Sequence, residues 1–159
     1  MPNWRASKAT PLLLAGSAVL ASHTGNTNET ILATVNIPAG LMGPNDQLVI
    51  RALWTSPFSV NTKTARIRLG GIGGTAYLDN PYTTAITLDT LKHITARNSQ
   101  TSQVGGQAAT AGPTNTGATV IITSAVDMTA ATTLVFTAQL GNAADTIALE
   151  MYEVELWKR

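Results

Sequence analysis

The titratable side chains that could carry chemistry are few and scattered. The two histidines, His23 and His93, have no second histidine or acid at a metal-binding or catalytic spacing such as HxH or HExxH. We expect His23 to lie in a turn and His93 on the polar face of a strand. The sequence therefore predicts no catalytic residue, no metal site and no cofactor, and it predicts that the protein is not an enzyme.

Most of the acids have a structural explanation. Four of them fall at expected turns or strand boundaries, where a short carboxylate accepts hydrogen bonds from nearby backbone N–H groups. These are Asp46, Asp79, Asp127 and Asp145. A glycosidase would need two carboxyl groups about 5 to 10 Å apart in a cleft, and the sequence indicates no such cleft. A small carbohydrate-processing enzyme remains an alternative for which no acid–base pair can be named.

The glycine run GGIGG, residues 70–74, has the composition of a loop that binds phosphate. Thr75 follows it directly, so the Gly-Lys-Ser/Thr ending of a P-loop is absent. No helix follows whose N-terminus could bind an anion. We predict a hairpin connection between two strands instead.

Lys63, Arg66 and Arg68 are expected to form a basic strip on one face of a strand, and Arg51 could join them. Such a strip could bind phosphate or carboxylate, or pair with acids across strands or across a subunit interface. A nucleic-acid surface would add interleaved aromatic residues and a net charge well above the observed +1. We favour the interface, and we predict no nucleic-acid partner.

Large aromatic residues lie beside basic residues near both ends of the chain. Trp4 is close to Arg5 and Lys8, and Trp157 precedes the final Lys-Arg pair. Tryptophan and arginine are typical of anchoring contacts between proteins. We therefore add Trp4, Arg5, Lys8 and Trp157 to Arg66 and Arg68 as candidate interface residues. The alternative is that each tryptophan packs on its own domain.

Composition points to a β protein. The 159 residues suit one domain, 44% are hydrophobic, and only 12% are charged, about half the usual fraction. The 25 threonines favour half-exposed strands. A Thr-rich surface of low charge is typical of β proteins within larger assemblies, although an ordinary β domain can share it. The absence of cysteine excludes disulfides. No apolar run approaches the roughly 20 residues that span a bilayer, so we predict no membrane contact.

The stretch PLLLAGSAVLASHTG, residues 11–25, has features of a secretory signal peptide, because basic residues precede an apolar run that ends in small residues. Gly16 and Ser17 interrupt the run, and a strand explains it better. At period two, one strand face would carry every second residue from Leu12 to Leu20. We predict a first strand over residues 11–23, preceded by an N-terminal arm of residues 1–10.

Strand-like runs then recur with turn residues between them. They span residues 29–38, 47–55, 62–70, 75–80, 118–124, 132–140 and 145–157, and 86–97 is ambiguous between a strand and a helical turn. The last run slips phase after Met151, which indicates a β-bulge. Trp54 is expected in the core. The sequence predicts an all-β, antiparallel jelly-roll β-sandwich of about eight strands over residues 11–157, favoured over a barrel or an immunoglobulin-like sandwich.

The segment NSQTSQVGGQAATAGPTNTG, residues 98–117, differs from the rest. It carries no charge, and Val104 is its one large apolar residue. It cannot bury a face of its own, so we predict a long surface loop. Loops of this length are often functional.

Four segments carry a resemblance to known proteins: TNETILATVNIPAGLMGPNDQLVIRALW, KTARIRLGG, ITARNSQTSQVGG and AADTIALEMYEVEL. In the order of their strands and turns, over roughly residues 11–156, they resemble small virion structural proteins of tailed bacteriophages. The resemblance implies a jelly-roll fold and assembly, commonly as a homotrimer. It implies a capsid decoration (cement) protein or a tail or fibre component, and it supplies no catalytic residues.

The function that we expect is therefore a non-enzymatic virion structural protein. In the leading interpretation it is a trimer that binds and stabilises the capsid shell, with itself and the major capsid protein or another virion protein as partners. The alternative is a tail or fibre component that acts as an adaptor or a host-receptor-binding module. In that case the loop at residues 98–117 would present its polar side chains to a host glycan.

Overall fold

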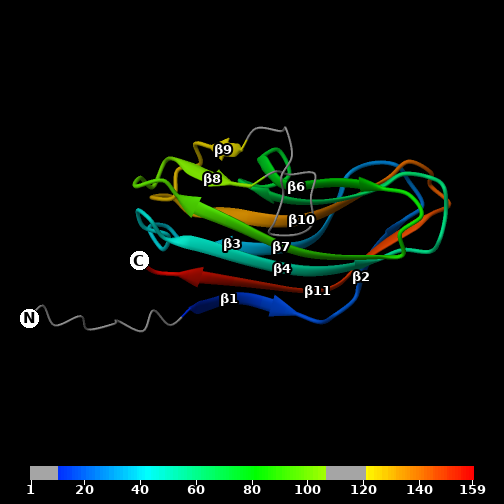
Figure 1. Ribbon diagram of the computed structural model, residues 1–159, viewed down its shortest axis with the longest axis horizontal. Coiled ribbons are helices and arrows are strands. Elements are labelled where there is room, and N and C mark those ends of the chain that lie inside the picture. The colour runs from blue at the N-terminus through cyan, green and yellow to red at the C-terminus, as the bar shows by residue number, and fades with distance from the viewer. Residues whose placement is uncertain (1–10, 107–120) are drawn as a thin grey trace, which may run out of the picture.

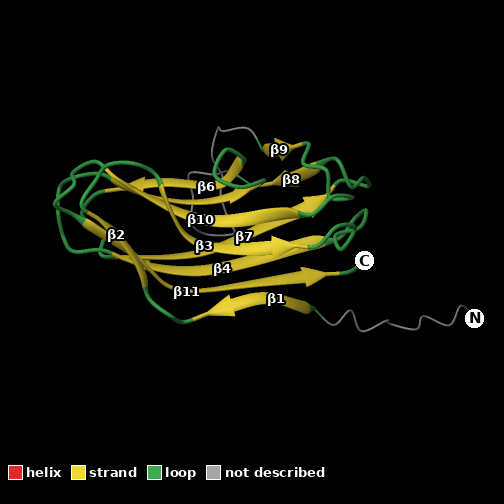
Figure 2. Ribbon diagram, turned by 180° about the vertical axis from the view of Figure 1, so that it is seen from behind, coloured by secondary structure: helices red, strands yellow, loops and turns green. Residues whose placement is uncertain are grey.

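Two antiparallel β-sheets pack face to face in the computed structural model, which describes residues 11–106 and 121–159 (Figure 1). All regular elements of this part of the chain are strands (Figure 2). Within it, no helix has the length and hydrophobicity to cross a bilayer. The strands are β1 (Leu12–Ser17), β2 (Ala21–Thr24), β3 (Thr30–Ile37), β4 (Gln47–Thr55), β5 (Lys63–Leu69), β6 (Thr75–Tyr82), β7 (Thr87–Ala96), β8 (Gln103–Gly105), β9 (Ile122–Ser124), β10 (Thr132–Leu140) and β11 (Thr146–Trp157).

The strand order is that of a jelly roll. The large sheet has the order β1-β11-β4-β7-β8-β9, with β2 also paired to β11, and the small sheet has the order β3-β10-β5-β6. The chain crosses between the sheets after β2, β3, β4, β6, β9 and β10, as the Greek-key connections of a jelly roll require. The prediction of an all-β jelly-roll sandwich is confirmed. The strand count exceeds eight because the first strand is divided and β8 and β9 are added to the large sheet.

The core lies between the sheets and is formed by alternate residues of the longer strands. Trp54 has no exposed surface, as predicted, and its ring centroid lies 6.3 Å from that of Phe136. Phe136 also packs against Tyr152, with ring centroids 4.8 Å apart. These three aromatic side chains join the small sheet to the large one.

The first predicted strand is wrong in one respect. Residues 18–20 interrupt it, so β1 and β2 are separate and the period-two face does not continue to Leu20. The pairing with β11 shows where the extra residue lies. Ser17 pairs with Tyr152 and Ala21 pairs with Leu149, so three residues of one strand must pass two of the other.

The β-bulge in the last strand is confirmed. Leu149 is opposite Trp54 and Met151 is opposite Leu53, so Glu150 is the extra residue. Residues 86–97, which were ambiguous between a strand and a helical turn, contain the strand β7.

The GGIGG segment connects β5 to β6 as a hairpin, as predicted. Gly70 and Gly71 have φ values of 93° and 80°, which favour glycine.

The predicted loop at residues 98–117 is partly wrong. Gln103–Gly105 forms β8, which pairs with both β7 and β9, so Val104 lies within a sheet. Residues 107–117 lie outside the described residues, as do the first three residues of the strand predicted at 118–124.

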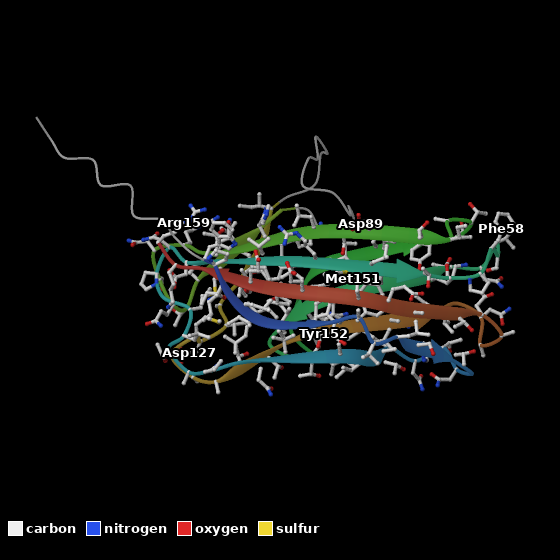
Figure 3. All side chains as sticks on the ribbon, turned by 90° about the horizontal axis from the view of Figure 1, so that it is seen from below. Phe58, Asp89, Asp127, Met151, Tyr152 and Arg159 are labelled. Carbon is white, nitrogen blue, oxygen red and sulfur yellow. The ribbon has the colours of Figure 1, made fainter. Side chains whose placement is uncertain are left out.

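The connections gather at the two ends of the sandwich. Residues 56–62, 83–86 and 141–145 lie at one end, which we call the tip, and the connection from β2 to β3 starts there, because Gly25 donates its N–H to Ala143 O at 3.0 Å. The chain enters β1 at the other end, where the C-terminus also lies (Figure 1). Phe58 and Arg159 accordingly lie at opposite ends of the molecule (Figure 3).

Candidate functional site

The candidate interface residues predicted from the sequence do not form one cluster. Arg66 and Arg68 lie on the outer face of the small sheet, whereas Trp157 ends β11 in the large sheet. Trp4, Arg5 and Lys8 lie outside the described residues. Their role in an interface therefore remains a prediction. Within residues 11–106 and 121–159, no group of three or more His, Asp or Glu side chains could hold a metal ion.

The two arginines belong to an ion network within one subunit. Arg68 donates to both carboxylate oxygens of Glu29, from Nε to Oε1 at 2.7 Å and from Nη2 to Oε2 at 3.0 Å. Arg66 Nη1 lies 3.4 Å from Glu29 Oε2, and its Nε donates to Asp79 Oδ1 at 2.9 Å. Thr137 also donates its hydroxyl proton to Glu29. The network balances two positive charges with two negative ones.

Glu29 is the centre of this network. Its side chain is 20% exposed, and those of Arg66 and Arg68 are 14% and 18% exposed. Burial alone would raise the pKa of Glu29. The hydrogen bonds from Arg68 and Thr137 and the charges of both arginines outweigh that effect and hold the pKa below its ordinary value.

Two details of the predicted basic strip are wrong. Lys63 does not lie beside Arg66 and Arg68, because odd and even residues of a strand face opposite sides and Lys63 points inward, with no exposed surface. Arg51 lies in the large sheet and donates to Glu153 at 2.6 Å.

Asp79 was expected at a strand boundary, but it lies within β6. This strand continues through Pro81 because it is an edge strand.

The C-terminal residues bind their own domain. Trp157 is half-buried, and its Nε1 donates to Glu155 at 3.2 Å. Asp46, which is 3% exposed, accepts from the backbone N–H of Arg159 at 2.9 Å and lies 3.1 Å from Lys158 Nζ. Burial alone would raise the pKa of Asp46, but the hydrogen bonds from Arg159, Gly43 and Lys158 hold it below its ordinary value.

Of the two histidines, His93 is exposed on a strand, as predicted. The prediction for His23 is wrong, because it lies in β2 opposite Ile147 and is 4% exposed.

Lys92 is a further buried cation, 5% exposed, on the inward side of β7. Burial lowers the pKa of Lys92 to about 8.

The tip carries a feature that sequence analysis did not single out. Phe58, Val60 and Ile86 are 71%, 77% and 57% exposed. The loops that carry them are joined, because Ser56 donates its N–H to Ile86 O at 3.0 Å and its hydroxyl to Ala85 O at 3.2 Å. In the sequence, Phe58 and Val60 of SPFSVN could have indicated this surface. They are apolar and follow a strand, but the strand cannot continue beyond Pro57.

The buried Lys63 fixes the conformation of this apolar loop. Its Nζ donates to Ser59 Oγ and to Asn61 O, each at 2.9 Å, and lies 5.9 Å from the ring centroid of Tyr82. Ser59 Oγ in turn donates to Asp145 Oδ2 at 3.1 Å. The ammonium group therefore binds the residues on both sides of Val60, through the Ser59 hydroxyl and the Asn61 carbonyl.

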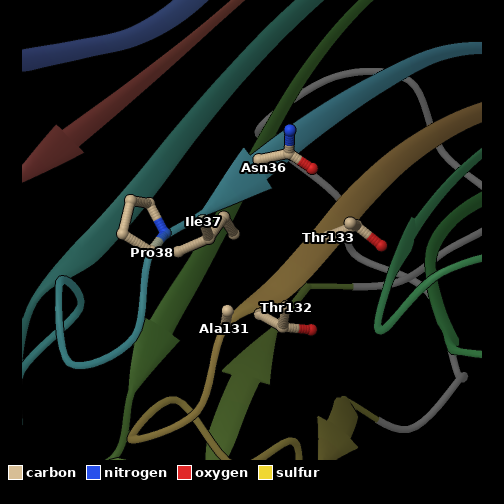
Figure 4. Close-up of a pocket in the computed structure, with 6 residues that line it drawn as sticks. All are labelled: Asn36, Ile37, Pro38, Ala131, Thr132 and Thr133. Atoms are coloured by element: carbon tan, nitrogen blue, oxygen red, sulfur yellow. The ribbon is translucent and has the colours of Figure 1, made fainter.

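A shallow surface pocket of about 220 Å³ lies between the end of β3 and the start of β10 (Figure 4). It is lined by Asn36, Ile37, Pro38, Ala131, Thr132 and Thr133. No charged side chain lines it, and its wall is largely apolar. The arrangement offers van der Waals contact rather than acid–base chemistry.

Comparison with known proteins gives similarity in fold only. No family model matches the chain. No curated protein matches it. The crystal structure of the infectious bursal disease virus VP2 subviral particle is 15% identical, with a TM-score of 0.40, over 92% of this chain and 32% of that one. The infectious bursal disease virus Gx strain structure is 12% identical, with a TM-score of 0.37, over 92% and 30% of the two chains. The chain thus spans about a third of the length of these proteins.

Proposed function

We propose that this protein is a non-enzymatic structural component of a bacteriophage virion, a trimeric capsid decoration protein that binds and stabilises the shell. Its resemblance in sequence to small virion proteins supports the proposal, as does its surface. The observation that carries it is the free edge of β1 and the bend that follows. This edge exposes four large apolar side chains: Leu12, Leu13, Val19 and Leu20.

The chemistry of this edge favours contact with another protein. Strand β1 is terminal in the large sheet, so one side of its backbone has no partner strand within the described residues. Soluble proteins usually protect such an edge with charges, proline or a covering loop. Residues 11–28 contain no Asp, Glu, Lys or Arg. The arm of residues 1–10 leads directly into this edge, so arm and edge can form one contact surface.

The mechanism that we propose is mechanical. The protein would bury apolar surface of the edge against the shell, with Trp4, Arg5 and Lys8 of the arm as anchors. Binding to the assembled shell and not to its dissociated subunits would stabilise the assembly by mass action. Three further residues remain candidate contacts with a neighbouring protein. They are Arg66 and Arg68 of the ion network and Trp157 of the last strand.

The proposal is tested with shells that lack this protein. Wild-type protein should sediment with such shells and raise the temperature at which they rupture. Deletion of residues 2–10 should abolish co-sedimentation while the domain stays folded, and Leu13→Ser should weaken it. Ile72→Ser, an exposed apolar residue of the β5–β6 hairpin, is the control and should bind as wild type. Normal binding by the deletion variant would refute the role of the arm.

The position on the virion separates this function from the tail alternative. Gold-labelled antibody against this chain should decorate the heads of intact particles in electron micrographs. Label confined to tails would contradict the decoration role and favour an adaptor or receptor-binding component. Replacing residues 107–117 with a short linker would then be expected to reduce adsorption to host cells.

A further inference from the structure

Two carboxylates lie on the outer face of the large sheet, next to the uncharged strand β1. Residues directly opposite each other on neighbouring strands point to the same side of a sheet. Glu155 of β11 is opposite Leu13 of β1, and Glu153 is opposite Gly16. Arg51 of β4 lies 2.6 Å from Glu153 but 3.8 Å from Glu155. One guanidinium group therefore serves two carboxylates, and Glu155 is the less well neutralised of the two.

Apolar side chains surround Glu155 on this face. Leu13 and Val49 flank it on the neighbouring strands, and Trp157 follows it two residues later on the same side of β11. Leu13 is 59% exposed, and the half-buried Trp157 donates its Nε1 proton to Glu155 at 3.2 Å. A carboxylate in such surroundings fits a ligand that combines a base with an apolar group.

The other bases at this end of the sheet are held elsewhere. Lys158 lies 3.1 Å from Asp46, and Arg159 donates to Gln47 at 3.4 Å. Arg97 follows β7, which is the third strand from β1 in the sheet. The part of the chain that the structure describes therefore supplies no second base to the carboxylates beside β1.

The N-terminal arm of residues 1–10 has the chemistry that this surface lacks. Its sequence, MPNWRASKAT, contains two bases, Arg5 and Lys8, and no acid. It also contains Trp4, a large apolar group with a polar N–H. The charge of the arm is thus complementary to that of the face, and its tryptophan matches the exposed apolar side chains there.

The arm is also within reach of this surface. It leads into β1 at Leu12, beside the end of β11 where Glu155 lies (Figure 1). An extended chain spans about 3.3 Å per residue, so Lys8 and Arg5 can lie up to about 17 and 26 Å from Leu13. Neighbouring strands are about 4.8 Å apart, so both bases can reach the Glu155 carboxylate.

We infer that the arm docks on the outer face of the large sheet of its own domain. Its bases pair with Glu155 and Glu153, and Trp4 packs on the apolar side chains of Leu13 and Trp157. Ion pairs on an exposed surface are weak and are screened by salt. The tether compensates for this weakness, because a short link gives the arm an effective concentration in the millimolar range.

The docked arm would control access to the edge of the large sheet. Leu13 belongs both to the docking surface and to the apolar edge of β1, so an arm docked on its own domain covers part of that edge. Covering an apolar edge protects a free subunit from unwanted association. The shell would then compete with the sheet for the arm, a consequence that, unlike the docking itself, rests on the proposed function.

Trypsin cleavage of the full chain tests the docking, because the bonds Arg5–Ala6 and Lys8–Ala9 both lie in the arm. Mass spectrometry follows the loss of the arm at low salt. Glu155→Gln removes the charge but keeps an acceptor for Trp157. Losing one exposed ion pair shifts an equilibrium by up to about fivefold, so we expect cleavage of this variant to be about three- to fivefold faster than that of wild type. Salt at about 0.5 M should remove the difference.

Asp79→Asn is the matched control. It removes the same charge from a partly exposed acid on the outer face of the small sheet, and its arm should be cleaved as in wild type. Thermal unfolding of both variants checks that the domain is intact. The cleavage rate per molecule should also stay constant over a hundredfold range of protein concentration, because the arm and its docking surface belong to one chain.

Three results would overturn the inference. They are equal cleavage rates in wild type and Glu155→Gln, equal acceleration in Glu155→Gln and Asp79→Asn, and protection of the arm that increases with protein concentration. The last result would assign the arm to the surface of another copy.

Co-sedimentation with shells separates the docking from the proposed function. Glu155→Gln, in which the arm is released, should bind shells at least as tightly as wild type, and weaker binding would contradict the competition between shell and sheet. A docked arm in a protein that ignores shells would refute the decoration role alone. Shell binding by a wild type whose arm is cleaved as fast as that of Glu155→Gln would refute the docking alone.

Discussion

Replacing Glu29 by glutamine removes the negative charge at the centre of the ion network on the small sheet. Glutamine keeps the shape of the side chain but leaves Arg68 and Arg66 without their shared carboxylate, and these guanidinium groups are only 18% and 14% exposed. Breaking a fully buried pair costs about 3 to 5 kcal/mol, and an exposed pair contributes less than about 1 kcal/mol. For this partly buried site we expect a loss of about 2 to 3 kcal/mol at neutral pH.

The lowered pKa of Glu29 determines how the stability difference between wild type and Glu29→Gln changes with pH. The pKa of Glu29 is lower in the folded protein than its ordinary value of 4.5. Its contribution is therefore fully present above pH 4.5 and is lost as the pH falls through the folded value. Glutamine does not titrate. The difference in unfolding free energy between wild type and Glu29→Gln should be constant from pH 7 to about pH 5 and should shrink at lower pH.

Urea unfolding followed by tryptophan fluorescence measures the loss of unfolding free energy and its change with pH, because Trp54 is fully buried and becomes exposed on unfolding. Glu153→Gln is the matched control. Its partner Arg51 lies 2.6 Å away, but the two side chains are 36% and 49% exposed. This control should lose less than about 1 kcal/mol. Equal losses in the two variants, or a Glu29→Gln difference that does not change with pH, would refute the reasoning.

Three other predictions concern the core, a buried cation and the C-terminal contact. Trp54→Ala should lower the unfolding free energy by about 3 to 5 kcal/mol, measured by urea unfolding with circular dichroism. Because the pKa of Lys92 falls from 10.5 to about 8 on folding, stability should rise with pH between those values, by at most about 3 kcal/mol. Lys92→Met should remove that slope in unfolding experiments at pH 8 to 10.5. Asp46→Ala should cost about 1 to 3 kcal/mol because the N–H groups of Gly43 and Arg159 lose their acceptor, and calorimetry should show a lower melting temperature.

The elements that could be predicted are those whose pattern is local. In β5, Ala65, Ile67 and Leu69 alternate with polar residues because one face of the strand packs on the other sheet, and that alternation is visible in the sequence alone. The bulge at Glu150 was also visible, because an extra residue shifts the phase of the strand that contains it. The jelly-roll class follows from many such strands joined by turns.

The features that could not be predicted depend on partners that are distant in the sequence. The break between β1 and β2 is visible only in their pairing with β11, more than a hundred residues away, where residues 18–20 pass residues 150 and 151. His23 of β2 lies opposite Ile147 of β11, and both side chains are buried. For Arg66 and Arg68 the sequence left phosphate binding, cross-strand pairing and a subunit interface open, and only the fold brings Glu29 to them.

Lys63 shows why a residue type alone does not reveal a role. In the sequence it is one of three basic residues in a strand. Its charge groups it with Arg66 and Arg68, although its odd position places it on the opposite face of the strand. In the fold that position directs it into the end of the sandwich, where loop atoms replace water around its ammonium group. The same geometry leaves Phe58 and Val60 in solvent, at the end opposite the start of β1.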